Sequence, residues 1–192
     1  MNEIIVNSRD LAQGLGAVIH AASTDPMRPV LHGVLFEGRQ GKLRLVAADN
    51  YRIAYAEIEA DALSEAPLIL PLDVASTLLK DCKATKMPDR VTITFDETGA
   101  TIAFGFGVTR NVRVAQGPFP NYVQVIPVDR EHDRTIGLSA RQLADLSALT
   151  DSSIRHQHST DTALRVTFGG PLDLIIVRGE YGTEVLMPVR LS

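Results

Sequence analysis

One order of elements recurs three times along this chain: a strand, a helix, and then three strands. In the first copy, an apolar run at residues 3–6 is followed by Ser8, a residue type that caps helices. Apolar residues then recur at helical spacing until prolines end the pattern. Residues 28–58 alternate apolar and polar side chains around a polar turn at 38–41, which predicts strands joined by a hairpin.

The second copy begins with an apolar run at residues 68–70. Asp73 is a candidate cap for the helix that follows, on which Val74, Leu78 and Cys82 share one face. Three strands are predicted next, at residues 90–95, 100–106 and 108–114.

The third copy follows a charged, proline-containing segment at 117–134, which we interpret as a surface linker. Residues 135–138 predict a strand, and Ser139 with Gln142 fits a capping box that opens a helix. That helix is expected to be lined by Leu143, Leu146 and Leu149. The last three strands are predicted at residues 163–168, 172–177 and 183–191.

A single unit of this kind cannot bury both its sheet face and its helix, whereas two units side by side can. The pattern therefore predicts an α+β fold of three βαβββ repeats, with helices on one face of antiparallel sheets. Residues 1–127 would form a complete domain of two repeats. Residues 128–192 would form a half domain whose single repeat has no partner.

Composition narrows the class of protein. The chain is 45% hydrophobic, as expected for a globular protein, and it holds no apolar run of about 18 residues that would span a membrane. The N-terminus has no signal-peptide pattern, and Cys82 is the single cysteine, so we expect a cytoplasmic protein. A net charge of −4 requires any contact with nucleic acid to come from a local patch.

Four motifs occur in order along the chain: RPVLHGVLFE at 28–37, ADNYRIA at 48–54, PFPNY at 118–122 with VIP at 125–127, and MPVRL at 187–191. They resemble motifs of the bacterial sliding clamp family, the β subunit of DNA polymerase III. The resemblance covers the middle domain of that family at residues 5–127 and the second half of its last domain at 134–191. It implies the DNA-clamp fold.

The resemblance implies a DNA sliding clamp, a processivity factor that encircles duplex DNA as a homo-oligomer and tethers polymerase or repair proteins. Expected partners are duplex DNA, bound without sequence preference, and a DNA polymerase or other proteins that carry clamp-binding linear motifs. A clamp loader is a further candidate partner. Rings of this family contain about twelve repeats, which favours four chains of three repeats, with third repeats pairing about a two-fold axis. Alternative assemblies are an open dimer and a smaller ring. The alternative function is a non-encircling adaptor or decoy that binds clamp-binding peptides.

The resemblance also implies a peptide-binding groove with apolar pocket residues and arginines at its rim. By motif match the groove contains Leu31, Asn50, Tyr51, Arg52, Ile53, Pro127, Val185, Met187, Pro188, Val189 and Arg190. Two positions depart from the family pattern, because Asn50 stands where glycine is usual and Ala48 where threonine is usual. Without the resemblance, Met187 and Val189 would be interpreted as core residues of a strand.

In this family the helices line the inner surface of the ring and face DNA. The DNA-facing candidates are Arg9, His20, Lys80, Lys83, Lys86, Arg141 and Arg155. They would contact phosphates without reading bases, which suits sliding. The alternative is an ordinary solvated lysine face, and Asp145 and Asp151 weaken the expectation for the third helix.

Catalytic and cofactor chemistry is not indicated. His156 and His158 with Asp161 lack a fourth ligand and the spacing of a metal site. Ser152 and Ser153 lack the sequence context of a nucleophile, and there is no Walker A or dinucleotide-binding glycine motif. We therefore expect a protein that is not an enzyme and that uses no metal or cofactor.

Overall fold

The computed structural model describes residues 2–39, 41–49, 52–62, 66–84, 89–105, 107–124, 136–145, 164–167, 174–178 and 183–188. The chain divides into two compact units, which we call unit 1 (Met1–Ile126) and unit 2 (Pro127–Ser192). Each unit is described by itself. In the described part of the chain, the helices are too short to cross a membrane.

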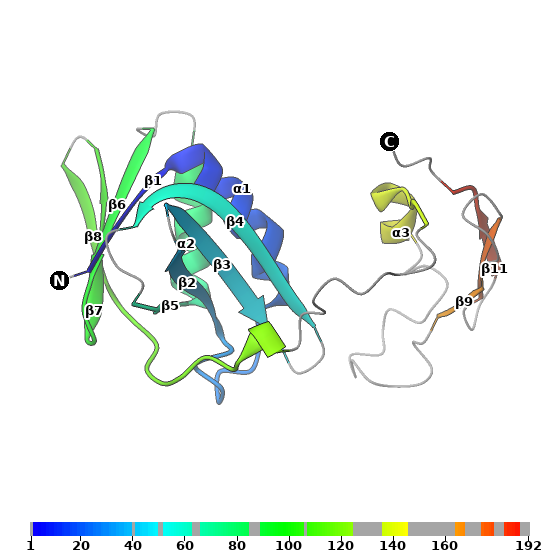
Figure 1. Ribbon diagram of the computed structural model, residues 1–192, viewed down its shortest axis with the longest axis horizontal. Helices are drawn as coiled ribbons and strands as arrows, with labels where there is room; N and C mark the ends of the chain where they lie inside the picture. The colour runs from blue at the N-terminus through cyan, green and yellow to red at the C-terminus, as the bar shows by residue number, and fades with distance from the viewer. Residues whose placement is uncertain are drawn as a thin grey trace. The chain divides into compact units, whose positions relative to one another are not determined.

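Unit 1 contains two copies of the predicted order (Figure 1). The first copy consists of β1 (Asn2–Asn7), α1 (Ser8–Val18) with the 3-10 turn η1 (Ile19–Ala21), β2 (Gly33–Arg39), β3 (Lys42–Ala48) and β4 (Ile53–Ala62). The second consists of β5 (Leu68–Pro71), α2 (Leu72–Lys83), β6 (Arg90–Phe95), β7 (Gly99–Phe104) and β8 (Val108–Arg113). A 3-10 turn, η2 (Tyr122–Gln124), follows. The predicted α+β fold is confirmed.

The two copies exchange their first strands. The sheet order is β5-β2-β3-β4-β1-β6-β7-β8. β1 pairs antiparallel with β6 over six residue pairs, and β5 pairs with β2 from Gly33↔Pro71 to Phe36↔Leu68. The Ala115 N–H donates to the Ile69 carbonyl at 2.9 Å, which links the segment after β8 to β5. Each copy is therefore completed by a strand from the other.

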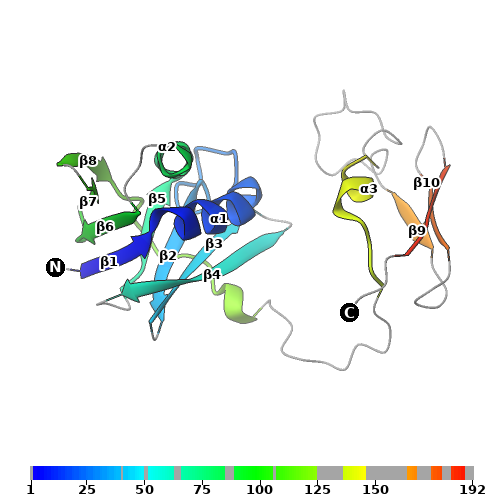
Figure 2. The ribbon, with the colours of Figure 1, turned by 90° about the horizontal axis from the view of Figure 1, so that it is seen from above.

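Both helices of unit 1 cover the same face of the sheet, where the main core lies (Figure 2). Gly14 of α1 permits close packing on β3 and β4, because a Cβ there would lie 2.7 Å from Cδ1 of Leu45. Cys82 of α2 is buried, as its spacing predicted, and burial raises the pKa of its thiol to about 12. The thiol is thus protonated and unreactive at neutral pH.

The helix starts differ slightly from the sequence predictions. Asn7, not Ser8, caps α1, because its side-chain oxygen accepts from the backbone N–H of Arg9 at 2.9 Å. Ser8 is instead the first helical residue and is buried. Likewise α2 starts at Leu72, so Asp73 lies within the first turn, where a carboxylate suits the helix dipole.

Unit 2 contains α3 (Ala140–Asp145) and a sheet of β9 (Arg165–Thr167), β10 (Ile175–Arg178) and β11 (Thr183–Leu186) in the order β11-β10-β9. Its core is formed by Ile175, Val177 and Leu186, with Ile136, Leu138 and Leu164 packed against them. β9 and β11 lie within the predicted strands, and β10 overlaps the predicted strand at 172–177 and ends one residue later.

The predicted strand at residues 135–138 is wrong for the residues that can be examined. Residues 136–138 adopt no strand, although Ile136 and Leu138 contact the core. The physical reason is visible in unit 1, where the first strand of each copy is paired with the second strand of the other copy. The described part of unit 2 offers residues 136–138 no such strand. Leu143 is 43% exposed rather than a lining core residue, while Leu146 and Leu149 lie outside the described residues.

Candidate functional site

The candidate peptide site in unit 1 is built on the connection between β3 and β4. Ala48 pairs with Ile53 across the two strands. The Asp49 carboxylate accepts from the backbone N–H of Arg52 and from its Nε, both at 3.0 Å. The Asp49 N–H in turn donates to the Arg52 carbonyl at 3.1 Å. These bonds fix a turn that holds Arg52 at the rim with about half of its side chain exposed. Asn50 and Tyr51 lie outside the described residues.

Beside this turn lies a second apolar cluster, on the face of the sheet opposite the helices. Its buried members are Leu35, Val46, Ile69 and Tyr122, with Val30, Ile53, Ala115 and Phe119 packed around them. Leu35 alternates along β2 with Val34 and Phe36, which belong to the main core, so the two clusters lie on opposite faces. Ile53 therefore faces away from the helices, as a groove residue should.

Leu31 lies in the turn before β2, next to Val30 of the same cluster. Its N–H donates to the Arg28 carbonyl at 3.0 Å, and its carbonyl accepts from Ser23 N–H at 3.0 Å. Leu31 is half-buried. Two backbone bonds thus hold the leucine in place while leaving part of its side chain accessible.

The PFPNY motif anchors this cluster. Phe119 and Tyr122 meet edge to face, with ring centroids 6.3 Å apart. The Tyr122 hydroxyl donates to the Glu37 carboxylate at 2.5 Å, and Arg39 Nε donates to the same carboxylate at 2.9 Å. Burial alone would raise the pKa of Glu37, but the hydrogen bonds from Tyr122 and Arg39 outweigh it and lower that pKa. A charged Glu37 thus fixes Tyr122 under the sheet surface next to the candidate site.

Tyr55 is a further candidate residue for this site that the sequence analysis missed. It lies two residues after Ile53 on β4, pairs with Val46 and is 49% exposed. The Arg44 guanidinium, which is ion-paired with Glu57, lies over its ring, 5.5 Å from the centroid. The alternation along β4 places Tyr55 on the same face as Ile53 and was the signal that could have found it.

Unit 2 supplies the other predicted groove residues. Val185 and Met187 are 53% and 68% exposed, whereas Leu186 between them is only 2% exposed and faces the core. Pro188 is half-buried. The interpretation of Met187 as a core residue is therefore wrong, and its exposed apolar surface is available for contact. Pro127, Val189 and Arg190 lie outside the described residues.

The predicted groove residues are divided between the two units. Leu31, Arg52 and Ile53 belong to unit 1, and Val185, Met187 and Pro188 belong to unit 2. That these two sets form one groove stays a prediction.

The predicted DNA-facing residues of unit 1 are exposed on its helices. Arg9, His20, Lys80 and Lys83 all have exposed side chains. Among the described residues, the ion pairs do not include Arg9, Lys80 or Lys83, whereas Asp81 of α2 pairs with Arg110 of β8 at 2.9 Å. Arg141 is exposed on α3 of unit 2, and Lys86 and Arg155 lie outside the described residues.

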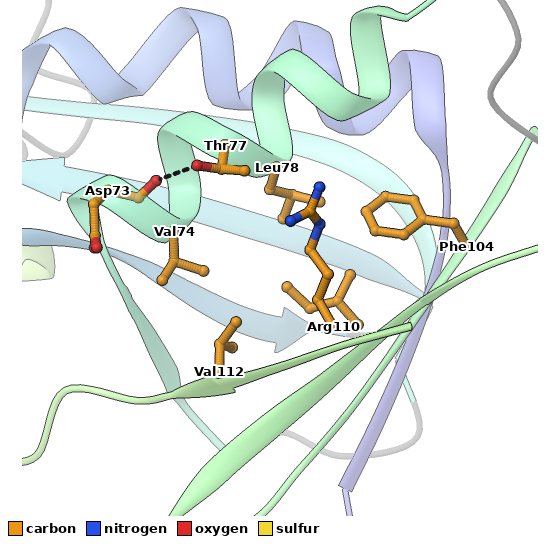
Figure 3. A pocket seen from close by; sticks show the side chains of 8 residues that line it. Asp73, Val74, Thr77, Leu78, Phe104, Arg110 and Val112 are labelled. Atoms are coloured by element: carbon orange, nitrogen blue, oxygen red, sulfur yellow. Dashed lines mark hydrogen bonds between the residues drawn. The ribbon is translucent and has the colours of Figure 1, made fainter. Parts of the chain in front are cut away.

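A small apolar pocket opens between α2 and strands β7 and β8 (Figure 3). Val74, Leu78, Phe104 and Val112 line it, and the Thr77 hydroxyl at its edge donates to the Asp73 carbonyl at 2.9 Å. Asp73 and Arg110 are the charged residues that line it, and Arg110 is ion-paired with Asp81. The pocket thus offers apolar walls but no group poised for chemistry. In the part of the chain that the structure describes, no cluster of side chains is suited to a metal ion. His156, His158 and Asp161 lie outside that part.

Comparisons with known proteins point to one family. The family model described as "DNA polymerase III beta subunit, central domain" matches residues 5–121. The beta sliding clamp of Synechocystis sp. is 29% identical over 147 residues, covering 69% of this chain and 37% of that protein. The beta sliding clamp of Treponema pallidum is 27% identical over 137 residues, covering 70% of this chain and 36% of that protein. The chain thus spans little more than a third of the length of these relatives.

Solved structures of sliding clamps share the fold. The Pseudomonas aeruginosa sliding clamp bound to griselimycin superposes with a TM-score of 0.79 at 20% identity, covering 97% of this chain and 50% of that chain. The DNA polymerase III β subunit of Thermotoga maritima gives a TM-score of 0.68 at 19% identity, covering all of this chain and 66% of that one. The family model covers more than half of the sequence, and the matched residues contain β5, most of the sheet of unit 1 and the Arg52–Ile53 corner. This chain therefore belongs to the DNA polymerase III β subunit family, that of the bacterial sliding clamps.

Proposed function

We propose that this protein is a non-catalytic sliding clamp that encircles duplex DNA as a homo-oligomer and tethers a polymerase or repair protein through a linear peptide. In this proposal unit 1 is a complete clamp domain and unit 2 is half of one. The main observation in support of this proposal is that unit 1 has two different candidate surfaces on opposite faces of its sheet. Exposed Arg9, Lys80 and Lys83 lie on its helices, and the Arg52–Ile53 corner lies on the opposite face of the sheet.

This separation suits a protein that holds two partners at once. A helix face with exposed cations attracts phosphates at any sequence, and the outer face remains accessible to a protein partner. A net charge of −4 disfavours tight adhesion to DNA over the whole surface and suits retention by topology. The proposal places the protein in the cytoplasm, where a polymerase and a clamp loader would be its partners.

The first test is retention on DNA. After assembly on nicked circular DNA, the protein is expected to remain bound through a wash at about 0.5 M salt, because screening weakens charge contacts but does not open a ring. Cutting the circle with a restriction enzyme should release the protein within the same wash, as followed by gel filtration. Equal loss from circular and linear DNA would contradict encirclement.

The second test addresses the helix face. Replacing Lys80 and Lys83 together with alanine should reduce the slope of log K against log salt for duplex DNA by about two, because each lost phosphate contact removes about one unit. Lys42 and Arg90 form a matched control, since they are exposed cations on the opposite face of the sheet. Their double alanine variant should leave the slope unchanged. Equal slopes for both double variants would locate the DNA contact elsewhere.

A non-encircling adaptor or decoy is the second candidate. The exposed Val185 and Met187 favour it as much as they favour a clamp, since both would bind the same peptides. Native mass separates the two, because an adaptor that acts as a single chain does not require assembly. A mass of one chain well above micromolar concentration would favour the adaptor.

A further inference from the structure

In the described part of unit 2, no strand occupies the position of the exchanged strand that completes each copy in unit 1. There, β6 is bordered by β1 and β2 is bordered by β5, in each case a first strand from the other copy. β9 holds the corresponding position in unit 2, as the strand that follows the helix. Within the described part of the chain, β9 pairs with β10 alone. Its other edge therefore leaves backbone N–H and C=O groups unpaired by strand partners.

The exposure of Val166 on β9 also indicates that this edge of the sheet has no partner in the described part of the chain. Val166 lies opposite the buried Val177, so it faces the core side of the sheet. It is nevertheless 50% exposed, whereas the core-facing Val34 of β2 and Val91 of β6 are fully buried. In unit 1 the exchanged strand and the second copy provide that cover. The exposure of Val166 thus fits a domain that contains one copy of the repeat, whereas unit 1 contains two.

A segment of matching position in sequence, residues 136–138, is present in the same unit but adopts no strand. Residues 136–138 precede α3, as β1 precedes α1, and Ile136 and Leu138 pack against the core of unit 2. In unit 1, β1 lies between the last strand of its own copy, β4, and the second strand of the other, β6. Residues 136–138 contact their own core, but within the described part of the chain they pair with no strand.

Other apolar side chains of unit 2 are also uncovered. Leu143 of α3 and Leu174 before β10 are 43% and 52% exposed. In unit 1 the two helices pack against each other. A half domain of this size buries little surface, so it is only marginally stable by itself. An exposed apolar face of this kind is typical of a surface that associates with another protein.

We propose that unit 2 is completed by unit 2 of a second copy of this chain, through reciprocal strand exchange about a two-fold axis. Residues 136–138 of each chain form a strand on β9 of the other, and the two α3 helices meet as α1 and α2 do. The sheet would then run β11-β10-β9 with the exchanged strands on either side, and Val166 would be buried. The proposal deepens the homo-oligomeric part of the proposed function, and the missing partner strand explains why residues 136–138 are irregular in a single chain.

The test compares native mass and peptide binding in two variants of the full chain. The wild-type protein should have the mass of two chains, or a multiple of two. Val166→Asp should halve that mass by raising the dissociation constant at least about 100-fold, since it places a charge in an apolar interface. Val108→Asp is the matched control, because it introduces the same charge at an apolar residue that is 51% exposed on β8 of unit 1. Its mass should equal that of the wild type.

Native mass tests the strand exchange, whereas peptide binding and DNA retention test the proposed function. Val166→Asp is expected to retain binding of a clamp-binding peptide, which also shows that its chain is folded. If it loses peptide binding, Val166→Thr is used instead, because threonine keeps the shape and strand preference of valine while making the buried face polar. An unchanged mass in a folded Val166 variant, or a wild-type mass of one chain at tens of micromolar, overturns the strand exchange. Loss of DNA retention with the paired mass intact would count against the clamp function alone.

Discussion

Replacing Met187 with Asp is expected to weaken binding of a Gln-Leu-x-Leu-Phe peptide by at least about 100-fold, measured by fluorescence anisotropy with a labelled peptide. In the proposed groove the Met187 thioether contacts apolar peptide side chains, and a carboxylate there would have to lose its water without gaining a partner. Because Met187 is 68% exposed, the substitution should leave the free energy of unfolding within about 0.5 kcal/mol of the wild type.

A matched control for this variant is Val108→Asp. Val108 of β8 is an apolar residue that is 51% exposed and lies in unit 1, away from the Asp49–Arg52 turn in sequence. It introduces the same charge into the same protein, so any effect of net charge on the peptide is shared. The peptide should bind this control as it binds the wild type. Wild-type affinity in Met187→Asp would refute the groove.

The order of elements could be predicted from the sequence because it depends on local periodicity. A period of two marks a strand and a period of 3.6 marks a helix whatever the rest of the chain does. The exchange of β1 and β5 between copies could not be predicted in this way. It joins segments such as Asn2–Asn7 and Arg90–Phe95, which are distant in sequence and carry no local sign of their pairing.

The failed prediction at residues 135–138 has the same origin. Ile136 and Leu138 alternate as strand residues should, but alternation only makes a strand favourable, and the hydrogen bonds must come from a neighbour. In unit 1 that neighbour is the second strand of the other copy. Periodicity likewise could not tell which face of β11 is buried, so it did not distinguish exposed Val185 from buried Leu186.

The site was predicted only in part, because different signals identify different residues. Motif similarity located Arg52 and Ile53, and the structure adds why they are held there: Asp49 binds Arg52, and Tyr122 supports the cluster that includes Ile53. Tyr55 was not predicted because it falls outside the ADNYRIA motif. It becomes a candidate because it shares a face of β4 with Ile53, and that face is known only when the sheet is assembled.

The strand exchange itself makes the largest stability prediction. Gly33→Ala should reduce the free energy of unfolding of unit 1 by about 2–3 kcal/mol, measured by urea denaturation with far-UV circular dichroism. Gly33 opens β2 and pairs with Pro71 of β5. A Cβ at Gly33 would lie 2.6 Å from the Leu70 carbonyl oxygen, which belongs to the backbone and cannot rotate away. The methyl group must therefore push β5 from β2, at one of the two strand pairings that join the copies.

Gly16→Ala provides the matched control, since it is the same substitution in the same unit. Gly16 is exposed in the last turn of α1, and a Cβ there would meet no atom of the described residues within 4 Å beyond its own helix backbone and chain neighbours. Alanine should therefore stabilise the helix by about 0.5–1 kcal/mol, because it restricts the unfolded chain and favours helical backbone angles. Opposite signs for the two variants are the expected result. If Gly33→Ala is as stable as the wild type, β5 can move away from β2 at little cost, and the copies are then held together mainly by the β1–β6 pairing and by the packing of α1 against α2.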